Sequence, residues 1–324
     1  MTELYLYLPQ LNLFAGNTNI TGDAGLSNEM KTYYSDYLID MAEPELIHNQ
    51  FGQKHPIPKN GGKIIEFRKY SPLPKLTTAL AEGVTPDGQK LTMSVINAEI
   101  KQYGGYVELS DMLLLTAIDN NLVQATELLG SQAGRTLDTL TRDVLAAGTN
   151  VQYAEGQVAA RASVSAEHVL TVDAVRKGVR NLKRMNAKRI NGSYVGIIHP
   201  DAAYDLMSDP KWVNVKSYSD PDGIYEGEIG KIEGVRFVET SEAKVFEGAG
   251  ASGADVYATL ILGANAYGVT EVSGGGLQHI VKQLGSAGTA DPLNQRATAG
   301  WKATHAAKIL VEEYMVRVET GASA

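Results

Sequence analysis

Three short stretches of the sequence carry residue types that could do chemistry, and the first is His199-Pro200-Asp201. It places an imidazole two residues from a carboxylate, and both groups serve in general acid–base catalysis. No serine or cysteine in a recognisable nucleophile elbow accompanies them. Because Pro200 suits the first turn of a helix, we interpret the stretch as a junction between a strand and a helix.

The other two stretches, Asp220-Pro221-Asp222-Gly223 and Gly274-Gly275-Gly276, could bind a cation or a phosphate. The first offers two carboxylates, but the remaining positions of a calcium loop are not filled, so we interpret it as a turn. The second lacks the G-x-x-x-x-G-K-[ST] pattern and precedes no clear helix, which favours a flexible loop. An oligomeric α/β enzyme that uses these stretches is the alternative from a different functional class.

The composition narrows the chemistry further. The chain has no cysteine, which excludes disulfides and thiolate catalysis, and its six histidines show no metal-binding spacing. We therefore predict no catalytic residue, no cofactor and no metal. The net charge of −8 argues against a general nucleic-acid-binding protein, because such proteins usually carry an excess of basic residues.

One predicted helix and its exit nevertheless carry a basic run. A solvated helix face that suits the C-terminal end of the helix dipole is the simpler interpretation. A contact with DNA or with the acidic residues of another subunit is the alternative. The run consists of Arg176, Lys177, Arg180, Lys183, Arg184, Lys188 and Arg189.

The elements that would position these residues belong to one large or two ordinary domains, since the chain has 324 residues, 44% of them hydrophobic. Glu3 and Pro9 interrupt the N-terminal apolar run, and no stretch supplies the roughly 18 apolar residues of a membrane helix. We expect no signal peptide, no membrane contact and a soluble protein inside a cell. An extended arm at 16–28 and a short helix through Tyr33 and Met41 should follow.

The longest predicted element is a helix from Ile118 to Asn150, on the order of 45 Å long. Apolar residues recur along it every three or four positions, while Glu127 and Asp138 should face outward and Gly148 should end the helix in a left-handed conformation. Gly130 and Gly134 mark close backbone approach or a bend, or else are tolerated defects. The predicted stripe consists of Ile118, Leu122, Ala125, Leu129, Ala133, Leu137, Leu140, Val144 and Ala147.

A long hairpin from Lys63 to Tyr103 is the second predicted element. Strands at 63–70 and 92–103 alternate apolar and polar residues, whereas the part between them is rich in turn formers and has no core of its own. We expect it to lie on its own body or on a neighbouring subunit, and Tyr103-Gly104-Gly105-Tyr106 to form a bulge or bend. The predicted intersubunit residues are Lys63, Phe67, Arg68, Leu73, Leu80, Val84 and Asp87.

Helices and strands alternate from Ala166 to Gln283, which predicts an α/β domain. Thr171 should cap a helix that ends near Met185, and a buried strand at 194–198 should precede a helix that begins at Pro200. Strands are expected at 235–238 and 257–262. A final extended run within 301–319 should pair next to the long helix.

In order along nearly the whole chain, from about Leu11 to Glu319, these segments resemble the major capsid proteins of tailed double-stranded DNA bacteriophages, in the family named after the head protein of the N-four type podoviruses. No single motif is chemically diagnostic, but their order makes the resemblance specific. The matching segments are 51–54, 56–59, 65–70, 82–88, 102–106, 262–269, 282–288, 295–298 and 300–302.

The resemblance implies an α+β protein with the Hong Kong 97-type capsid fold. It divides the chain into an N-terminal arm (1–60), an extended loop (61–107), a peripheral domain (108–165 and 284–324) with the spine helix 118–150, and an axial domain (166–283). No motif assigns the Lys–Asn cross-link that some relatives form.

The function implied is that of a structural protein that self-assembles, as pentamers and hexamers, into an icosahedral head. The head would enclose double-stranded DNA without sequence-specific contact, within a virion assembled in the bacterial cytoplasm. The short arm implies a separate scaffolding protein, and a portal protein and a decoration protein are further implied partners. An encapsulin-like compartment that packages proteins is the alternative within the same fold.

Overall fold

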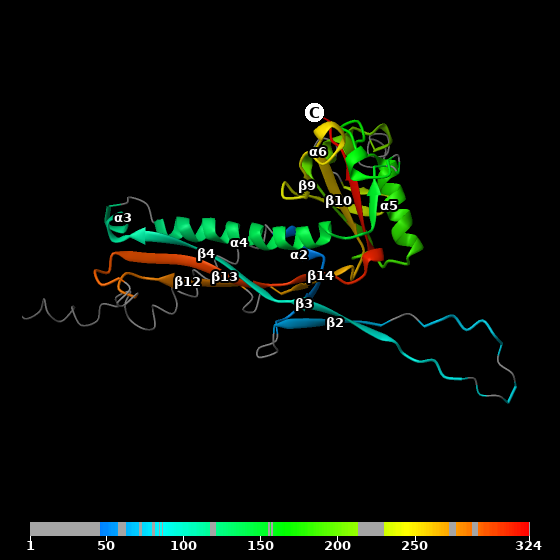
Figure 1. Cartoon of the computed structure of the whole chain (residues 1–324), viewed down its shortest axis with the longest axis horizontal. Helices are drawn as coiled ribbons and strands as arrows, with labels where there is room; N and C mark the ends of the chain where they lie inside the picture. Colours follow the sequence, from blue (N-terminus) through cyan, green and yellow to red (C-terminus); the bar gives the residue numbers. More distant parts are fainter. Residues whose placement is uncertain are drawn as a thin grey trace, which may run out of the picture.

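The computed structural model shows an elongated molecule in which a long unit of one helix and three strands joins a compact α/β unit, and a hairpin projects beyond the junction (Figure 1). The expected helix through Tyr33 and Met41 lies outside the described residues. The structure describes residues 46–57, 63–70, 73–79, 82–83, 85, 87–116, 121–154, 156, 158–212, 230–271, 277–286 and 291–323.

The long helix is confirmed as α4, Asn121–Ala146, although it ends four residues earlier than predicted, and 118–120 lie outside the described residues. Glu127 faces solvent as expected. The outward placement of Asp138 is wrong, because its side chain is 1% exposed and contacts His48. Gly130 and Gly134 are both buried on the packed face, which favours close approach.

The end of α4 differs from the predicted glycine cap. Gly148 is not among the residues with positive φ, and a Cβ there would meet the Leu145 carbonyl oxygen at 3.2 Å and Ile309 Cδ1 at 3.3 Å. Arg317 instead caps the helix, since its Nη1 donates to the carbonyls of Ala146 and Gly148. A side chain from a distant strand therefore satisfies the last carbonyls.

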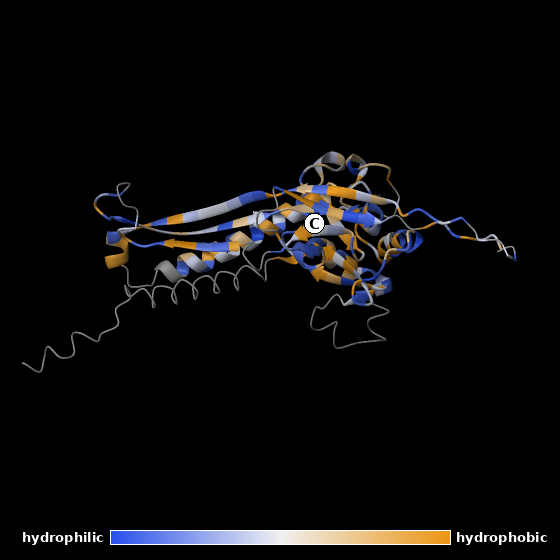
Figure 2. Cartoon of the chain, turned by 90° about the horizontal axis from the view of Figure 1, so that it is seen from below, coloured by the Kyte–Doolittle hydropathy of each residue, from blue (hydrophilic) through white to orange (hydrophobic). Residues whose placement is uncertain are grey.

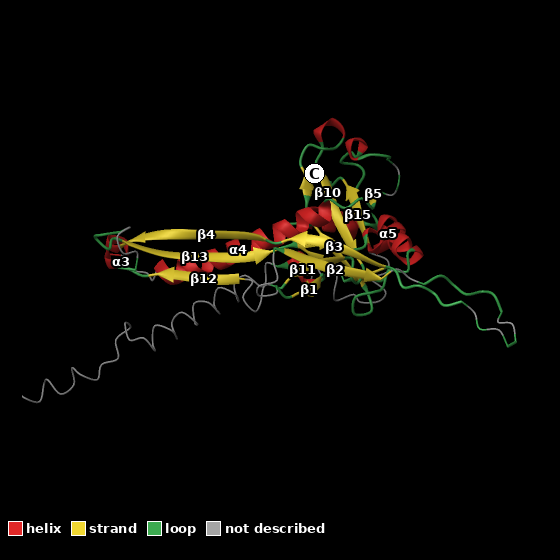
Figure 3. Ribbon diagram, turned by 60° about the horizontal axis from the view of Figure 1, so that its bottom comes forward, coloured by secondary structure: helices red, strands yellow, loops and turns green. Residues whose placement is uncertain are grey.

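A long three-stranded sheet lies along α4, in the order β12-β13-β4 (Figure 3). Its strands are β12, Leu277–Lys282, β13, Arg296–His305, and β4, Lys101–Ser110. Alternate residues of β13 face the helix, where Trp301 and Ala303 pack on Leu129 and Leu137. The apolar stripe of α4 and the alternate apolar residues of β13 thus bury each other.

The expected bulge at Gly104-Gly105 is wrong. Gly104 pairs with Lys302 and Gly105 with Trp301 in uninterrupted register. A Cβ on Gly104 would meet the Trp301 carbonyl oxygen at 2.7 Å, so the glycines permit close approach within a regular strand. The predicted return strand is interrupted at Ile100 instead, where the chain passes from β3 to β4.

The predicted hairpin is confirmed as β2, Ile64–Tyr70, paired antiparallel with β3, Met93–Glu99. Ile65, Phe67 and Ala98 on its inner face pack on Ala306 of the body. Beyond the Tyr70–Met93 pair the chain continues as the projecting loop at the lower right of Figure 1.

The compact unit contains a seven-stranded sheet in the order β5-β15-β10-β6-β8-β7, with β9 paired to β10. As predicted, α5, Val172–Arg184, begins after Thr171, whose side chain accepts from the Ala174 amide, and α6, Pro200–Ser208, follows β6. The strands are β5, Val151–Tyr153, β6, Tyr194–Ile198, β7, Lys231–Ile232, β8, Val235–Glu239, β9, Val245–Phe246, β10, Val256–Leu262, and β15, Met315–Thr320.

Strand pairing departs from the expected domain division at several elements, among them β5, which lies in the compact sheet although 108–165 was expected in the peripheral domain. The last strand, β15, lies between β5 and β10 in the compact unit rather than beside α4, and β12 belongs to the long sheet rather than to the axial segment. The partners of β15 lie far from it in the sequence, so local pattern does not specify them.

The remaining elements connect the two units. The segment expected to belong to the arm includes α2, Ile47–Gln50, which contacts α4, and β1, Gln53–His55, which forms a small sheet with β11, Tyr267–Thr270, and β14, Ala307–Ile309. A short helix, α3, Asp111–Thr116, follows β4, and its Leu113 amide donates to Ser110 Oγ, which caps the helix. Across the described ranges, no helix is long and apolar enough to span a membrane.

Candidate assembly surfaces

The projecting hairpin is the first candidate assembly surface. Of the predicted contact residues, Lys63, Arg68, Leu73 and Asp87 are exposed, while Leu80 and Val84 lie outside the described residues. Phe67 departs from the prediction: it is 3% exposed and packs inside its own chain, which leaves it no free surface for a neighbour.

The hairpin also exposes apolar residues that the sequence analysis missed. Their common property is that they lie on the outer face of β2 or β3, or in the loop between the strands. The alternation in 64–70 contained this signal, because one apolar set must face away when the other is buried. They are Ile64, Tyr70, Leu76, Leu91, Met93 and Val95, with Leu76 77% exposed.

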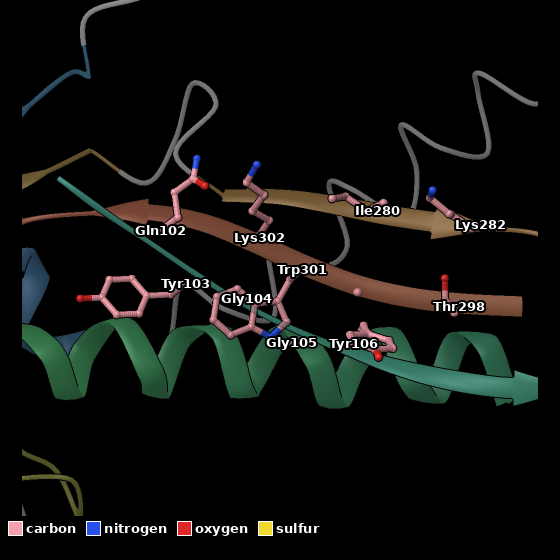
Figure 4. A pocket seen from close by; sticks show the side chains of 11 residues that line it. Gln102, Tyr103, Gly104, Gly105, Tyr106, Ile280, Lys282, Thr298, Trp301 and Lys302 are labelled. Atoms are coloured by element: carbon pink, nitrogen blue, oxygen red, sulfur yellow. The ribbon is translucent and has the colours of Figure 1, made fainter. Parts of the chain in front are cut away.

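A groove on the long sheet is the second candidate surface (Figure 4). It has a volume of about 410 Å³ on the face of the sheet that points away from α4. Gly104 and Gly300 form its floor, and Tyr106, 70% exposed, and Ile280, 41% exposed, stand beside it. Lys282 and Lys302 add positive charge at its margin. The surroundings suit an extended segment with apolar side chains.

The third candidate surface is the tip of the long unit, formed by α3 and the turn that contains Leu293. The Asp111 amide donates to the Gln295 carbonyl, which holds the two parts together. Figure 2 shows the apolar residues of α3 at the end of the molecule remote from the compact unit. The exposed members are Met112 at 60%, Leu113 at 43%, Leu114 at 37%, Leu115 at 79% and Leu293 at 75%.

Behind these surfaces, a buried pair of hydrogen-bonded side chains fixes α2 to α4. Asp138 accepts from both the backbone amide and Nδ1 of His48 at 2.6 Å, and the two side chains are 1% and 0% exposed. The Tyr267 hydroxyl donates to the His48 carbonyl. This pair explains why the helix carries a carboxylate on its buried face.

A second buried chain of hydrogen bonds continues from α2 to β13. Thr141 donates to Asn49 Oδ1 and lies 2.9 Å from His305 Nε2, while His305 Nδ1 lies 3.1 Å from Thr270 Oγ1. Because Thr141 already donates to Asn49, its oxygen accepts from His305 Nε2–H. Thr270 Oγ1 accepts from the Ala306 amide and donates to Nδ1, so this network requires neutral His305.

We expect His305 to make folding stability depend on pH. Burial lowers its pKa from 6.5 to about 4, against a smaller opposing effect of Asp138. Below pH 6.5 the unfolded chain binds a proton that the folded chain does not, so stability should fall by roughly 3 kcal/mol from pH 6.5 to 4.

The measurement is denaturant unfolding across this pH range, with His305→Gln as the comparison. Gln keeps an amide donor for Thr141 but does not titrate, so the free energy of unfolding of this variant should depend less on pH. The same pH dependence of stability in both proteins would contradict the role given to His305.

An ionic cluster joins the end of α4 to the compact unit. Arg317, which caps α4, donates to Glu319 at 2.7 Å, and Arg161 also donates to Glu319. The Glu319 carboxylate raises the pKa of Arg161. Because Glu319 is 0% exposed, its charge needs a buried partner, and Arg317 and Arg161 both supply hydrogen bonds to it.

The first stretch considered for chemistry forms a helix N-terminus in the structure. His199 is the N-cap of α6, since Nδ1 accepts from the Asp201 amide, which confirms the strand–helix junction. Both 220–223 and 274–276 lie outside the described residues. In the described part of the chain, no group of histidine, aspartate and glutamate side chains could hold a metal ion.

Comparison with known proteins decides what this architecture is. A model of the family described as phage capsid protein matches residues 82–289. The chain belongs to this family. A comparison with curated protein sequences gave no match.

Solved structures show the same fold as this capsid protein. The capsid of Ralstonia phage GP4 superposes with a TM-score of 0.67 at 15% identity, over 86% of this chain and 88% of that one. The capsid of cyanophage P-SCSP1u gives 0.66 at 14%, over 86% and 89%. The virus-like particle from Pyrococcus furiosus gives 0.51 at 12%, over 90% and 99%.

These findings confirm the expected fold and the structural function. The protein is a major capsid protein of a phage head with a Hong Kong 97-type fold, and its place is the capsid of the virion. Copies of the chain therefore assemble into a shell.

Proposed function

We propose that this capsid protein forms pentamers and hexamers of an icosahedral head that encloses double-stranded DNA, and that it catalyses no reaction. The projecting hairpin carries the proposal, since it exposes apolar side chains and its distal part has no core of its own. A separate scaffolding protein, a portal protein and a decoration protein are proposed partners, and assembly takes place in the host cytoplasm.

Within the shell, the hairpin of one copy lies on the long sheet of the next. The exposed apolar residues of the hairpin match the apolar walls of the groove around Tyr106 and Ile280. Lys63, Arg68, Leu73, Leu80, Val84 and Asp87 remain the proposed contacts. The domain boundaries at 60, 107, 165 and 283 also remain proposals, with β15 assigned by its pairing to the compact unit.

Electron microscopy of the purified protein tests this function. Closed shells or ring-shaped capsomers are expected, whereas a small fixed oligomer would contradict the proposal. The likeness to the Pyrococcus furiosus particle favours one second candidate, an encapsulin-like compartment. Nucleic-acid content of particles isolated from infected or expressing cells separates the two: packaged DNA supports the head, and packaged protein supports the compartment.

The tip should matter for assembly but not for folding. Leu115 is 79% exposed, so Leu115→Asp should change the free energy of unfolding by less than about 0.5 kcal/mol. A carboxylate buried between copies would cost several times more, and closed shells should be lost. Thermal unfolding and electron microscopy measure the two effects; the control is Leu115→Met, which should assemble. Normal shells from Leu115→Asp would show that the tip is free in the particle.

A further inference from the structure

The second half of α5 and its exit form a basic patch, which we define as Arg180, Lys183, Arg184, Lys188 and Arg189. All five side chains are exposed. No acidic residue occurs between Asp173 and Asp201, so local sequence supplies no counter-charge. In a chain with a net charge of −8, such a concentration of positive charge is distinctive.

In the first half of the same helix, by contrast, a basic side chain is neutralised by acidic residues of its own chain. Arg176 bonds to Glu233 at 2.8 Å and to Asp173 at 2.9 Å. Among the described residues, no member of the basic patch has such an ion pair. The patch is therefore exposed positive charge that the described part of the chain does not pair.

The opposite end of the same sheet is acidic. We define the acidic edge as Asp201, Glu239, Glu247 and Asp255, all exposed, at the end where β6 and β8 finish and β10 begins. Asp201 and Asp255 both act on Tyr257, whose pKa rises to about 12 through burial first and then these carboxylates. The nearby base Lys244 already pairs with Asp143.

The two regions are too far apart to neutralise each other within one chain. The Lys188 carbonyl accepts from the Ala264 amide just beyond β10, whereas Asp255 lies at the start of β10. Seven residues of strand at about 3.3 Å each separate the two ends by roughly 20 Å. That exceeds the Debye length of about 8 Å at physiological salt.

We propose that the basic patch of one copy contacts the acidic edge of the next copy, head to tail, around a capsomer. A contact between two different surfaces of identical chains repeats, and it closes into a ring when the rotation permits. The inference rests on the proposed assembly into pentamers and hexamers. It adds which surfaces of the compact unit meet, and it makes their contact electrostatic.

Charge reversal tests the pairing. One variant combines Arg180→Glu, Lys183→Glu, Arg184→Glu and Lys188→Glu, which makes the patch net negative. A second variant combines Asp201→Lys, Glu239→Lys and Glu247→Lys, which makes the edge net positive. Each variant alone places like charges opposite each other, so the yield of capsomers and shells should fall roughly tenfold or more. A chain with both sets of substitutions restores opposite charges and should assemble like the parent. The control Lys183→Arg with Arg184→Lys keeps the charge and should also assemble.

Mixing the two reversed proteins gives a second readout. In an alternating ring each contact again joins opposite charges, so the mixture should form even-numbered rings that neither protein forms alone. This result would also show that both reversed proteins are folded, as circular dichroism should confirm. Sedimentation velocity and electron microscopy measure the products.

Two outcomes would overturn the inference. Normal assembly of both reversed proteins would show that these surfaces do not meet. Normal shells with reduced DNA content from the reversed patch alone would assign the patch to packaged DNA. If the parent forms no particles, the proposed function itself fails, so the two failures are distinguishable.

Discussion

Leu137→Asp should leave little folded protein. Leu137 is 1% exposed at the centre of α4, where it packs against the long sheet in the cluster of Leu129, Trp301 and Ala303. The substitution removes apolar burial and places a second carboxylate beside Asp138, so we expect a loss of roughly 4 to 6 kcal/mol. That is comparable to the total stability of many domains. Soluble yield and thermal midpoint measure the effect.

Leu128→Asp is the matched control, because Leu128 is on the same helix and is 70% exposed. It has the same change of chemistry without the burial, so its thermal midpoint should stay close to that of the parent. Equal destabilisation of the two variants would contradict the packing of α4 on the long sheet.

Removing the projecting part of the hairpin should abolish shell assembly while the subunit still folds. Tyr70 pairs with Met93, so replacing residues 71–92 by Asn-Gly closes the hairpin with a two-residue turn. The inner contacts of Phe67 and Ala98 are retained. We expect near-native circular dichroism, because shortening a surface loop costs little, and monomers or small oligomers in sedimentation velocity.

Lys75→Ser is the control for the hairpin variant, since it removes one exposed charge and keeps the length. Its assembly should be normal. Full shells from the shortened protein would show that the projecting part makes no necessary contact between copies. A shortened protein that does not fold would instead place the loop on its own body.

Elements with strong local signals were predictable from the sequence. Thr171 caps α5 and Ser110 caps α3 because a hydroxyl accepts from an amide a few residues away, which needs no other part of the chain. The pairing of β2 with β3 was predictable for a similar reason, since a hairpin joins neighbours in sequence. Order along the chain also carried the resemblance to phage capsid proteins, which the family match confirms.

The candidate surfaces depended on which apolar residues remain uncovered, and this only tertiary structure decides. Phe67 and Tyr70 lie on one strand, yet the first is 3% and the second 63% exposed, because the body covers only the inner face. The apolar run from Met112 to Leu115 forms most of the short helix α3, but no described element covers these side chains.

The sequence by itself determined the spine helix, the N-caps of α3 and α5, the hairpin and the family, because periodicity, N-caps and turn chemistry act over a few residues. Tertiary structure alone decided that Asp138 is buried against His48, that Arg317 rather than Gly148 ends α4, and that β15 lies within the compact sheet. Each of these joins residues far apart in the chain. The pairing of a buried charge or of a distant strand depends on the whole fold, so no local pattern specifies it.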